Sequence, residues 1–408
     1  MKRKLTFALV ISLIFVTLLS SCAPLATPTE ATQAPTQAPT QVSSEETIPK
    51  EPIVIGVPSA FSGPIAYVGE SYMMGYTLAL EELGNEIAGY PIKLVTADNA
   101  CNPDQAVTAV RKLVDVDNVD LILGSGCSSA TLAVMPLLPE AEIAQITEGS
   151  TNPKIYDGSG VGGNIWQFRY VPDDRIMAEG FAPFIAAEVK SLSILAYNDD
   201  YGRGAAQSYQ DILGGLGVEV VSTEYFERGG ADFRPLLLNI KEDKPEGLLL
   251  VATESDGIVI LRQLKELGLT QKLFARGAIV TPLFMEMTKK EPGLNEGIME
   301  GTWWAPGLDP KFDVAFVNRW GTAPSPHRAT SYFIMRYVVK AAIEEAAKTG
   351  TVDRKSIRDA LEKISVETPV GVISFDAHHQ AYPNMAVSTV ENGTIKLLQV
   401  LETKAPTK

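Results

Sequence analysis

Short runs of β-branched residues alternate with amphipathic helical stretches from about residue 53 onward, and few fold classes accommodate this pattern. In the first half of the chain, the predicted strands are residues 53–57, 92–97, 119–123 and 143–146. Helical spacing occupies residues 71–86 and 103–115, with Asn102 as a candidate cap, and a further helix follows Ser128. Strands and helices that alternate in this way form a parallel sheet with helices on both faces.

A second series of the same units follows in the second half. The predicted strands are residues 192–197, 218–223, 247–251 and 272–275, with helices from about residue 202, over 233–241 and from about 255 to 267. Two comparable series predict an α/β protein with two doubly wound parallel-sheet lobes that face each other. Ligands of such sheets lie at the carboxyl ends of the strands, beside helix N-termini. The cleft between the lobes is therefore the predicted binding site.

The N-terminal residues indicate export. Lys2, Arg3 and Lys4 precede an apolar run over residues 5–19, which is shorter than the roughly 20 residues of a membrane-spanning helix. The run ends in Leu-Ser-Ser-Cys, which resembles the bacterial lipobox, whose cysteine is acylated and becomes the new N-terminus. We therefore expect residues 1–21 to be a lipoprotein signal peptide and Cys22 to carry the lipid. An ordinary secretory signal with an incidental cysteine is the alternative.

Residues 22–50 are rich in Pro, Thr, Ala and Gln and contain hardly any large apolar side chain. Such a segment cannot bury enough surface to offset the entropy lost on ordering, so we predict a flexible tether. The mature protein is then expected outside the cytoplasm, anchored to the cell membrane by lipid, at the cell surface or in the periplasm.

Charge and cysteine content narrow the function classes. A formal net charge of −14 argues against a nucleic-acid partner, because no basic stripe is present to displace counterions from phosphate. In an oxidising compartment the isolated pair Cys101 and Cys127 is a disulfide candidate, worth roughly 3 kcal/mol. The alternative, a catalytic thiol, needs a histidine, and histidine occurs only at His327, His378 and His379. The adjacent histidines have no evident third ligand, so we predict no metal site.

Two hydroxyl-rich turns follow neighbouring strands. The first is Gly-Ser-Gly-Cys-Ser-Ser at residues 124–129, and the second is Thr-Glu-Gly-Ser-Thr-Asn-Pro at residues 147–153. Free backbone N–H groups and Ser or Thr hydroxyls in such turns can hold a carboxylate, and two turns could clamp one anion. Judged by local chemistry, helix capping is the alternative for each turn.

Several segments taken together resemble one protein family. They are CNPDQAV from residue 101, CSSAT from 127, SGPIA from 62, STNP from 150, DDYGRG from 199, ILRQLKELGL from 260 and ISFD from 373. Their order and spacing resemble the leucine/isoleucine/valine-binding proteins, the solute receptors of bacterial ABC transporters, from about residue 53 to the C-terminus. The resemblance implies a type I periplasmic binding fold, in which a three-crossing hinge joins the two lobes.

The resemblance also implies domain bounds and partners. Crossings are expected near residues 170–173, 304–306 and 375–382. From their positions beside these crossings, we expect Arg169 to form an ion pair and Trp303–Trp304 to pack in the core, with contact to the ligand as the alternative for each. Residues 51–172 with 306–375 would form ligand-binding lobe 1, and residues 173–305 with 382–408 would form lobe 2. Such a receptor binds an amino acid or related small carboxylate and passes it to separate permease subunits. We expect a monomer, no cofactor and no enzymatic activity.

Family roles carry over to individual positions. The residues that the resemblance places around the ligand are Ser128, Gly149, Ser150, Thr151, Tyr201 and Tyr332. Ser128 and Thr151 match the hydroxyl residues that grip the ligand carboxylate. Tyr201 matches an aromatic wall from the second lobe. For each tyrosine, an ordinary core or rim aromatic is the alternative.

Other positions depart from the family pattern. The amine-binding glutamate of the family is replaced by Ala278, and a second-lobe tyrosine is replaced by Thr253, which Glu254 follows. Because an ammonium buried without a carboxylate is costly, either Glu254 or Glu148 replaces the lost partner, or the ligand is not a free amino acid. Amides and aromatic acids therefore stay open as ligands, as does a small-molecule sensor of the same fold. An extracellular hydrolase is disfavoured because the chain has no Gly-x-Ser-x-Gly elbow.

Overall fold

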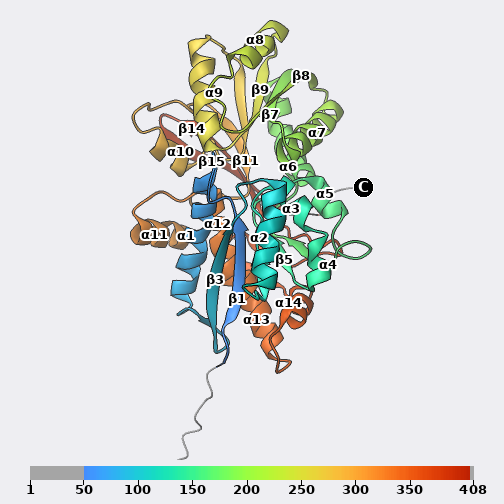
Figure 1. Ribbon diagram of the computed structural model, residues 1–408. Coiled ribbons are helices and arrows are strands. Elements are labelled where there is room, and N and C mark those ends of the chain that lie inside the picture. The colour runs from blue at the N-terminus through green and yellow to red at the C-terminus, as the bar shows by residue number, and fades with distance from the viewer. Residues whose placement is uncertain (1–49, 405–408) are drawn as a thin grey trace, which may run out of the picture. The chain divides into compact units, whose positions relative to one another are not determined.

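The computed structural model describes residues 50–404. The predicted signal peptide, Cys22 and all of the predicted tether except Lys50 lie outside the described residues. The described chain forms two α/β lobes, each built on one sheet, which confirms the predicted fold class (Figure 1). Within residues 50–404, none of the helices combines the length and the apolar character needed to cross a membrane.

The sheet of lobe 1 has the order β2-β3-β1-β4-β5-β6. Its strands are β1 Ile53–Ser59, β2 Glu86–Ile87, β3 Tyr90–Asp98, β4 Leu121–Leu123, β5 Gln145–Thr147 and β6 Gln167–Arg169. All neighbours pair in parallel except β2 with β3. Ile55, Ile122 and Phe168 on three of these strands are fully buried, because helices cover both faces of the sheet.

Lobe 1 draws its helices from two parts of the chain. The N-terminal helices are α1 Ala66–Glu82, α2 Pro103–Asp115, α3 Ser128–Val134, α4 Leu137–Ala141 and α5 Pro153–Asp157. The later helices are α11 Pro310–Trp320, α12 Pro326–Phe333, the π-helical η1 Ile334–Val339, α13 Lys340–Ala347 and α14 Arg354–Leu361, before the hairpin β12 Val366–Thr368 and β13 Gly371–Ile373. Residues far apart in sequence thus build one lobe, with α1 packed against α12.

The sheet of lobe 2 has the order β15-β14-β11-β10-β9-β7-β8. Its strands are β7 Ser191–Tyr197, β8 Glu219–Phe226, β9 Gly247–Val251, β10 Lys272–Arg276, β11 Met299–Thr302, β14 Met385–Glu391 and β15 Thr394–Leu401. Its helices are α6 Asp174–Glu188, α7 Asp200–Gly215, α8 Arg234–Asp243, α9 Glu254–Glu266 and α10 Pro282–Met287. Along β7, Leu195 and Tyr197 pack into one apolar cluster and Ile194 and Ala196 into another, so this sheet is also buried on both faces.

The chain passes between the two sheets three times, after β6, after β11 and after β13. Two of these passages lie side by side. Arg169 and Gln380 form a parallel bridge, and the Arg169 Nε donates to Gln380 Oε1 at 2.5 Å. Arg169 is also 3.5 Å from the Asp173 carboxylate, so it serves the expected ion pair.

The first helix differs from the sequence prediction. The spacing predicted a helix over residues 71–86, whereas α1 spans Ala66–Glu82. Gly84 and Asn85 have φ values of 71° and 60°, so the chain turns out of the helix there and enters β2. The prediction for α2 is confirmed, and the Asn102 side chain caps it by accepting from the backbone N–H groups of Asp104 and Gln105.

Candidate functional site

A pocket between the two lobes lies at the carboxyl ends of the strands. Its lining residues are Ile65, Val68, Gly126, Cys127, Ser128, Gly149, Tyr201, Arg228, Thr253, Gly277, Trp303 and His327. It leaves about 40 Å³ for the centres of water-sized molecules, which is room for a few waters or for one small solute when the lobes are closed. Both α/β lobes contribute the turns that follow their strands, as expected for sheets of this kind.

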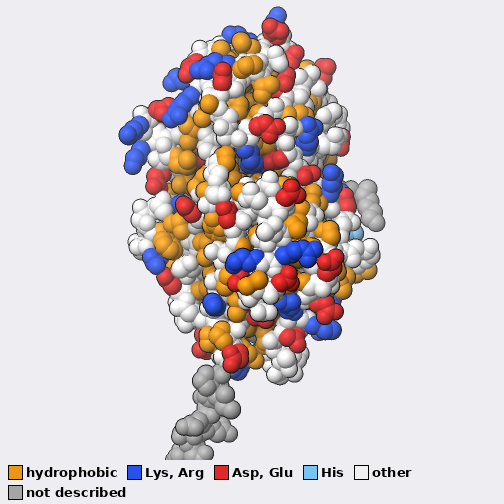
Figure 2. All heavy atoms as spheres, in the orientation of Figure 1, with side chains coloured by type: hydrophobic (Ala, Val, Ile, Leu, Met, Phe, Trp, Pro, Cys, Tyr) orange, Lys and Arg blue, Asp and Glu red, His pale blue; other side chains and the backbone are white. Residues whose placement is uncertain are grey.

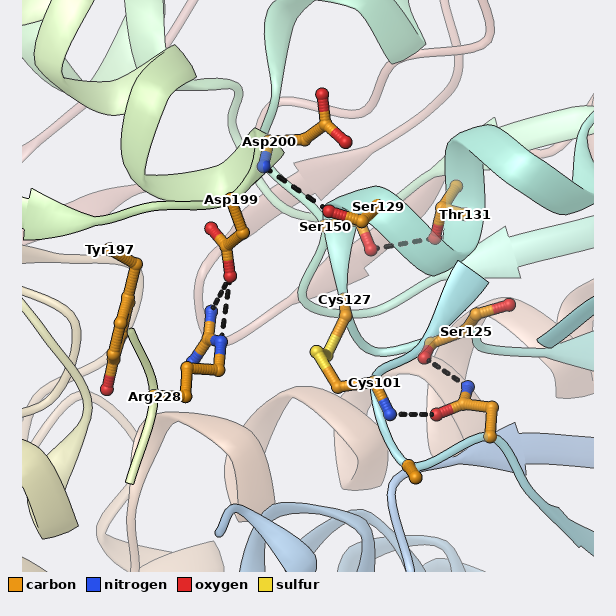
Figure 3. Close-up of a disulfide and its surroundings, with 12 residues drawn as sticks. Cys101, Ser125, Cys127, Ser129, Thr131, Ser150, Tyr197, Asp199, Asp200 and Arg228 are labelled. Atoms are coloured by element: carbon orange, nitrogen blue, oxygen red, sulfur yellow. Dashed lines mark hydrogen bonds and ion pairs between the residues drawn. A yellow bond between two sulfur atoms is a disulfide. The ribbon is translucent and has the colours of Figure 1, made fainter. Parts of the chain in front are cut away.

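The lobe 1 wall is built by the two predicted turns. Gly126, Cys127 and Ser128 follow β4 and lead into α3, and Gly149 follows β5. A Cβ atom at Gly149 would lie 2.1 Å from the Tyr72 hydroxyl, so only glycine fits this turn. The predicted disulfide is present, and it ties Cys127 to Cys101 beside the pocket (Figure 3).

The hydroxyl groups of these turns differ in their bonding. Ser128 Oγ accepts from the Asn152 backbone N–H at 3.3 Å. Ser150 Oγ lies 2.8 Å from Thr131 Oγ1, so its hydroxyl is engaged by α3 (Figure 3). Thr151 is fully buried, and its hydroxyl makes no well-aligned hydrogen bond among the described residues. It lies close enough to the buried Asp174 carboxyl to lower the pKa of that group, so Asp174 is a polar neighbour of this hydroxyl in the fold.

The lobe 2 wall is aromatic and basic. The Tyr201 hydroxyl donates to the Arg276 carbonyl oxygen at 3.1 Å. Arg228 pairs with Asp199 at 2.7 Å, and its guanidinium lies 3.7 Å from the centre of the Tyr197 ring (Figure 3). Because Asp199 neutralises it, Arg228 presents a fixed planar group to the pocket rather than a free charge.

Two fully buried carboxyl groups lie beside this pocket. Glu254 follows the lining residue Thr253, and its Oε2 accepts from the Tyr67 hydroxyl of lobe 1 at 3.0 Å. Its Oε1 has no partner, and burial raises the pKa of Glu254 to about 7. Glu148 precedes Gly149, neither of its carboxyl oxygens has a partner among the described residues, and burial raises its pKa to about 8.

The turn that contains Ala278 is held by the side chain of Glu300. Glu300 on β11 accepts from the backbone N–H groups of Gly277, Ala278 and Val280 at 2.6 to 2.9 Å. Ala278 itself has a φ of 102°, which is unfavourable for a residue with a Cβ atom. The Glu300 carboxyl oxygens are thus committed to holding a strained turn beside the pocket-lining Gly277.

Several pocket residues had no predicted binding role, among them three with large side chains. His327, Trp303 and Arg228 line the pocket, although Trp303 was assigned to packing and the other two received no binding role. His327 meets the rings of Tyr72 and Trp303 edge to face, at 5.4 and 6.2 Å between centroids. Burial, and then the nearby Arg328 and Arg276, lower the pKa of His327 to about 4, so the pocket sees a neutral imidazole.

The structure places the predicted residues in three groups. Ser128, Gly149, Tyr201 and Thr253 line the pocket, and Ser150, Thr151 and Glu254 are buried beside it. Tyr332 was assigned to the cleft and this assignment is corrected. Its hydroxyl donates to Glu82 at 2.7 Å and its ring packs 4.9 Å from that of Phe312, outside the pocket lining. The pocket residue on this helix is His327, one turn earlier.

Comparison with known proteins decides the family. The sequence profile of periplasmic binding proteins matches residues 52–394. The chain belongs to this family. Its relatives place it among the leucine/isoleucine/valine-binding, type I members, as the sequence motifs indicated. Members of the family are solute-binding components of ABC transporters that act outside the cytoplasm, and they are not enzymes.

Two relatives and one solved structure illustrate the range of this binding-protein family. An amino acid binding protein of Pseudomonas aeruginosa is 34% identical, over 56% of this chain and 61% of its own length. The leucine-, isoleucine-, valine-, threonine- and alanine-binding protein of the same organism is 25% identical, over 79% of this chain and 86% of its own. A solute-binding protein of an ABC transporter from Rhodopseudomonas palustris, in complex with 3,4-dihydroxybenzoic acid, shares the fold with a TM-score of 0.78 and 20% identity, covering 87% of this chain and 98% of the other.

Proposed function

We propose that this protein is a lipid-anchored receptor that captures an amino acid or related small carboxylate outside the cytoplasm and delivers it to the permease of an ABC transporter. The observation that carries this proposal is the pocket between the lobes. Its lobe 1 wall contains Ser128 and Gly149, on two turns at the carboxyl ends of neighbouring strands, and the buried Thr151 lies on the second of these turns. Donors of this kind suit a carboxylate.

The proposed hinge consists of residues 170–173, 304–306 and 375–382, with residues 51–172 and 306–375 in lobe 1 and residues 173–305 and 382–408 in lobe 2. Ligand would first bind one lobe, and closure of the other would trap it. A contact already joins the lobes, since Asn152 Nδ2 donates to the Asp200 carbonyl oxygen at 2.5 Å. Only a closed, loaded receptor would dock productively on the permease. Delivery, the lipid on Cys22 and a monomeric state are part of the same proposal.

The amino acid relatives support an amino acid ligand for the proposed receptor. An aromatic carboxylate is the second candidate, because Tyr201, Trp303 and His327 give the pocket three aromatic walls. The Rhodopseudomonas palustris neighbour that carries 3,4-dihydroxybenzoic acid shows that the fold accepts such a compound. The proposal includes no nucleic-acid partner. Figure 2 shows acidic and basic side chains interspersed over the face in view.

A thermal-shift screen of the purified mature protein tests the proposal. The panel contains the twenty common L-amino acids, acetamide, urea, benzoate and 3,4-dihydroxybenzoate, each at about 1 mM. A ligand that binds only the native state raises the melting temperature by mass action. We expect at least one carboxylate to produce a saturable shift. If only the neutral amides bind, or if no compound binds, the assignment of a carboxylate receptor is wrong.

A further inference from the structure

The balance of charge around the pocket is uneven. The basic side chains of its lobe 2 wall each have an acidic partner, Arg228 with Asp199 at 2.7 Å and Arg276 with Asp174 at 2.9 Å. The carboxyl of Glu254, by contrast, has no basic side chain within ion-pair distance among the described residues. A fully buried carboxylate without a counter-charge is costly, so this group needs either a proton or a cation.

Glu254 is buried directly beside the pocket wall. It is the first residue of α9 and directly follows Thr253, which lines the pocket. One of its oxygens accepts from Tyr67 on α1, in the opposite lobe, and the other oxygen is fully buried without a partner. Glu148, the other unpaired acid, lies within lobe 1 behind Gly149, close enough to Tyr72 and Tyr76 to affect their pKa values.

We propose that Glu254, held by Tyr67, forms a subsite for the ammonium group of the ligand, and that the Glu254 carboxyl is partly protonated at neutral pH when no cation is bound there. The inference rests on the proposed function and deepens it, because it names the ligand class as a zwitterion with a primary ammonium. Glu254 supplies a carboxyl from the turn that follows β9. Binding would then exchange a proton for the ammonium.

The groups around Glu254 support this exchange. Tyr67 and Tyr72 face it from α1, Arg328 from α12 and Glu300 from β11. Burial is the main cause that raises the pKa of Glu254, and Glu300 adds to it. The backbone N–H of Glu254, the Tyr67 hydrogen bond and the charge of Arg328 each lower it by less. At pH 7 the empty site is therefore about half protonated. An arriving ammonium stabilises the carboxylate, so the proton leaves to the buffer.

Isothermal titration calorimetry measures this exchange. The strongest amino acid from the screen is titrated at pH 7 in phosphate and in Tris, whose ionisation enthalpies differ, and the difference in heat gives the protons released. Its des-amino counterpart, for example 4-methylpentanoate for L-leucine, is titrated in the same way. We expect release of about 0.5 proton per amino acid bound, given a pKa of about 7. We expect no release with the des-amino acid, which should bind at least about 30-fold more weakly.

Two variants assign the proton to its carboxyl. Glu254→Gln should abolish proton release and leave the amino acid no better bound than its des-amino counterpart. Tyr67→Phe keeps the carboxyl but removes a hydrogen bond that lowers its pKa, so proton release at pH 7 should rise above the wild-type value. Because the two changes act in opposite directions, a general loss of folding cannot produce both results. Melting temperatures of the ligand-free variants report folding independently.

The outcomes separate this inference from the proposed function. An amino acid that binds without proton exchange, or a Glu254→Gln variant that still prefers the amino acid, would overturn the Glu254 subsite. Loss of proton release in Glu148→Gln, with release retained in Glu254→Gln, would overturn it as well. Equal binding of the des-amino acid refutes the subsite but leaves a carboxylate receptor intact. Binding of neither compound contradicts the proposed function itself.

Discussion

The backbone N–H of Asp200 donates to the Ser129 hydroxyl across 3.3 Å, so the first residue of α7 in lobe 2 meets the first turn of α3 in lobe 1 (Figure 3). The contact lies one residue from Ser128, which lines the pocket. It therefore joins the two lobes and belongs to the core of neither.

Ser129→Ala removes this contact without changing the pocket lining. A single hydrogen bond contributes about 1 kcal/mol net, so we expect the dissociation rate of the ligand to rise by about fivefold, with little change in association. Stopped-flow measurements of tryptophan fluorescence give both rates. Ser356→Ala, which disturbs the cap of α14 far from the rim, is the matched control and should leave both rates unchanged. A change in the association rate alone would argue against a role in closure.

Because the pKa of the buried Glu148 carboxyl is raised, we expect the protein to lose stability at alkaline pH. This pKa is about 8 in the folded protein and about 4.5 when exposed, so the folded state binds the extra proton. Stability is therefore full below pH 4.5 and is lost as pH rises through 8. Between pH 6.5 and 8 we expect Glu148 to lower the free energy of unfolding by about 2 kcal/mol, while Glu254 adds to the fall and His327 partly offsets it. Urea unfolding of the ligand-free protein measures the total change, and Glu148→Gln should make the profile less steep. A Glu148→Gln profile as steep as that of the wild type would show that Glu148 is ionised in the fold.

We expect removal of the disulfide to lower both the stability of the protein and its affinity for the ligand. Cys101→Ser with Cys127→Ser opens a loop with a sequence separation of 26 residues, which should cost about 3 kcal/mol of stability. Cys127 also lines the pocket and starts α3, so the ligand should bind more weakly as well. Thermal unfolding and calorimetry of the double variant measure the two effects. Unchanged affinity in a destabilised variant would show that the turn keeps its shape without the bond.

Two tyrosines with the same chemistry should respond differently to loss of the hydroxyl. Tyr201→Phe removes a donor in the pocket wall, where Tyr201 holds the Arg276 carbonyl, and should weaken ligand binding by several-fold. Tyr332→Phe removes a hydrogen bond to Glu82 outside the pocket and should lower stability by about 1 kcal/mol without changing affinity. Calorimetry compares the two variants. Weaker binding in Tyr332→Phe would restore the cleft role that the sequence motif assigned to it.

Local patterns were sufficient to predict the fold class and much of the secondary structure. The cap at Asn102 and the bounds of α2 follow from adjacent residues, and the two hydroxyl-rich turns follow from the strands that precede them. The early end of α1 depends on left-handed backbone at Gly84 and Asn85, which the apolar spacing of the helix does not reveal.

The lobe 2 and α12 sides of the site depend on tertiary contacts. His327 reaches the pocket because α12 packs against α1 and sets its ring against Tyr72, a contact between residues about 250 positions apart. A motif match assigned the role to Tyr332, one turn later on the same helix, where the side chain faces Glu82. The lack of an ion-pair partner for the Glu254 carboxyl likewise depends on where the neighbouring charged side chains lie in the fold, which the sequence does not give.

The central claim is that the Ser128 and Thr151 turns of lobe 1 bind the ligand carboxylate, and calorimetry of one double variant tests it most directly. Ser128→Ala with Thr151→Ala removes both hydroxyls and leaves the backbone, Tyr201 and Glu254 in place. We predict that the best carboxylate ligand of the wild type loses at least about 100-fold in affinity, while the ligand-free melting temperature stays within a few degrees. Wild-type affinity in a folded double variant would contradict the account.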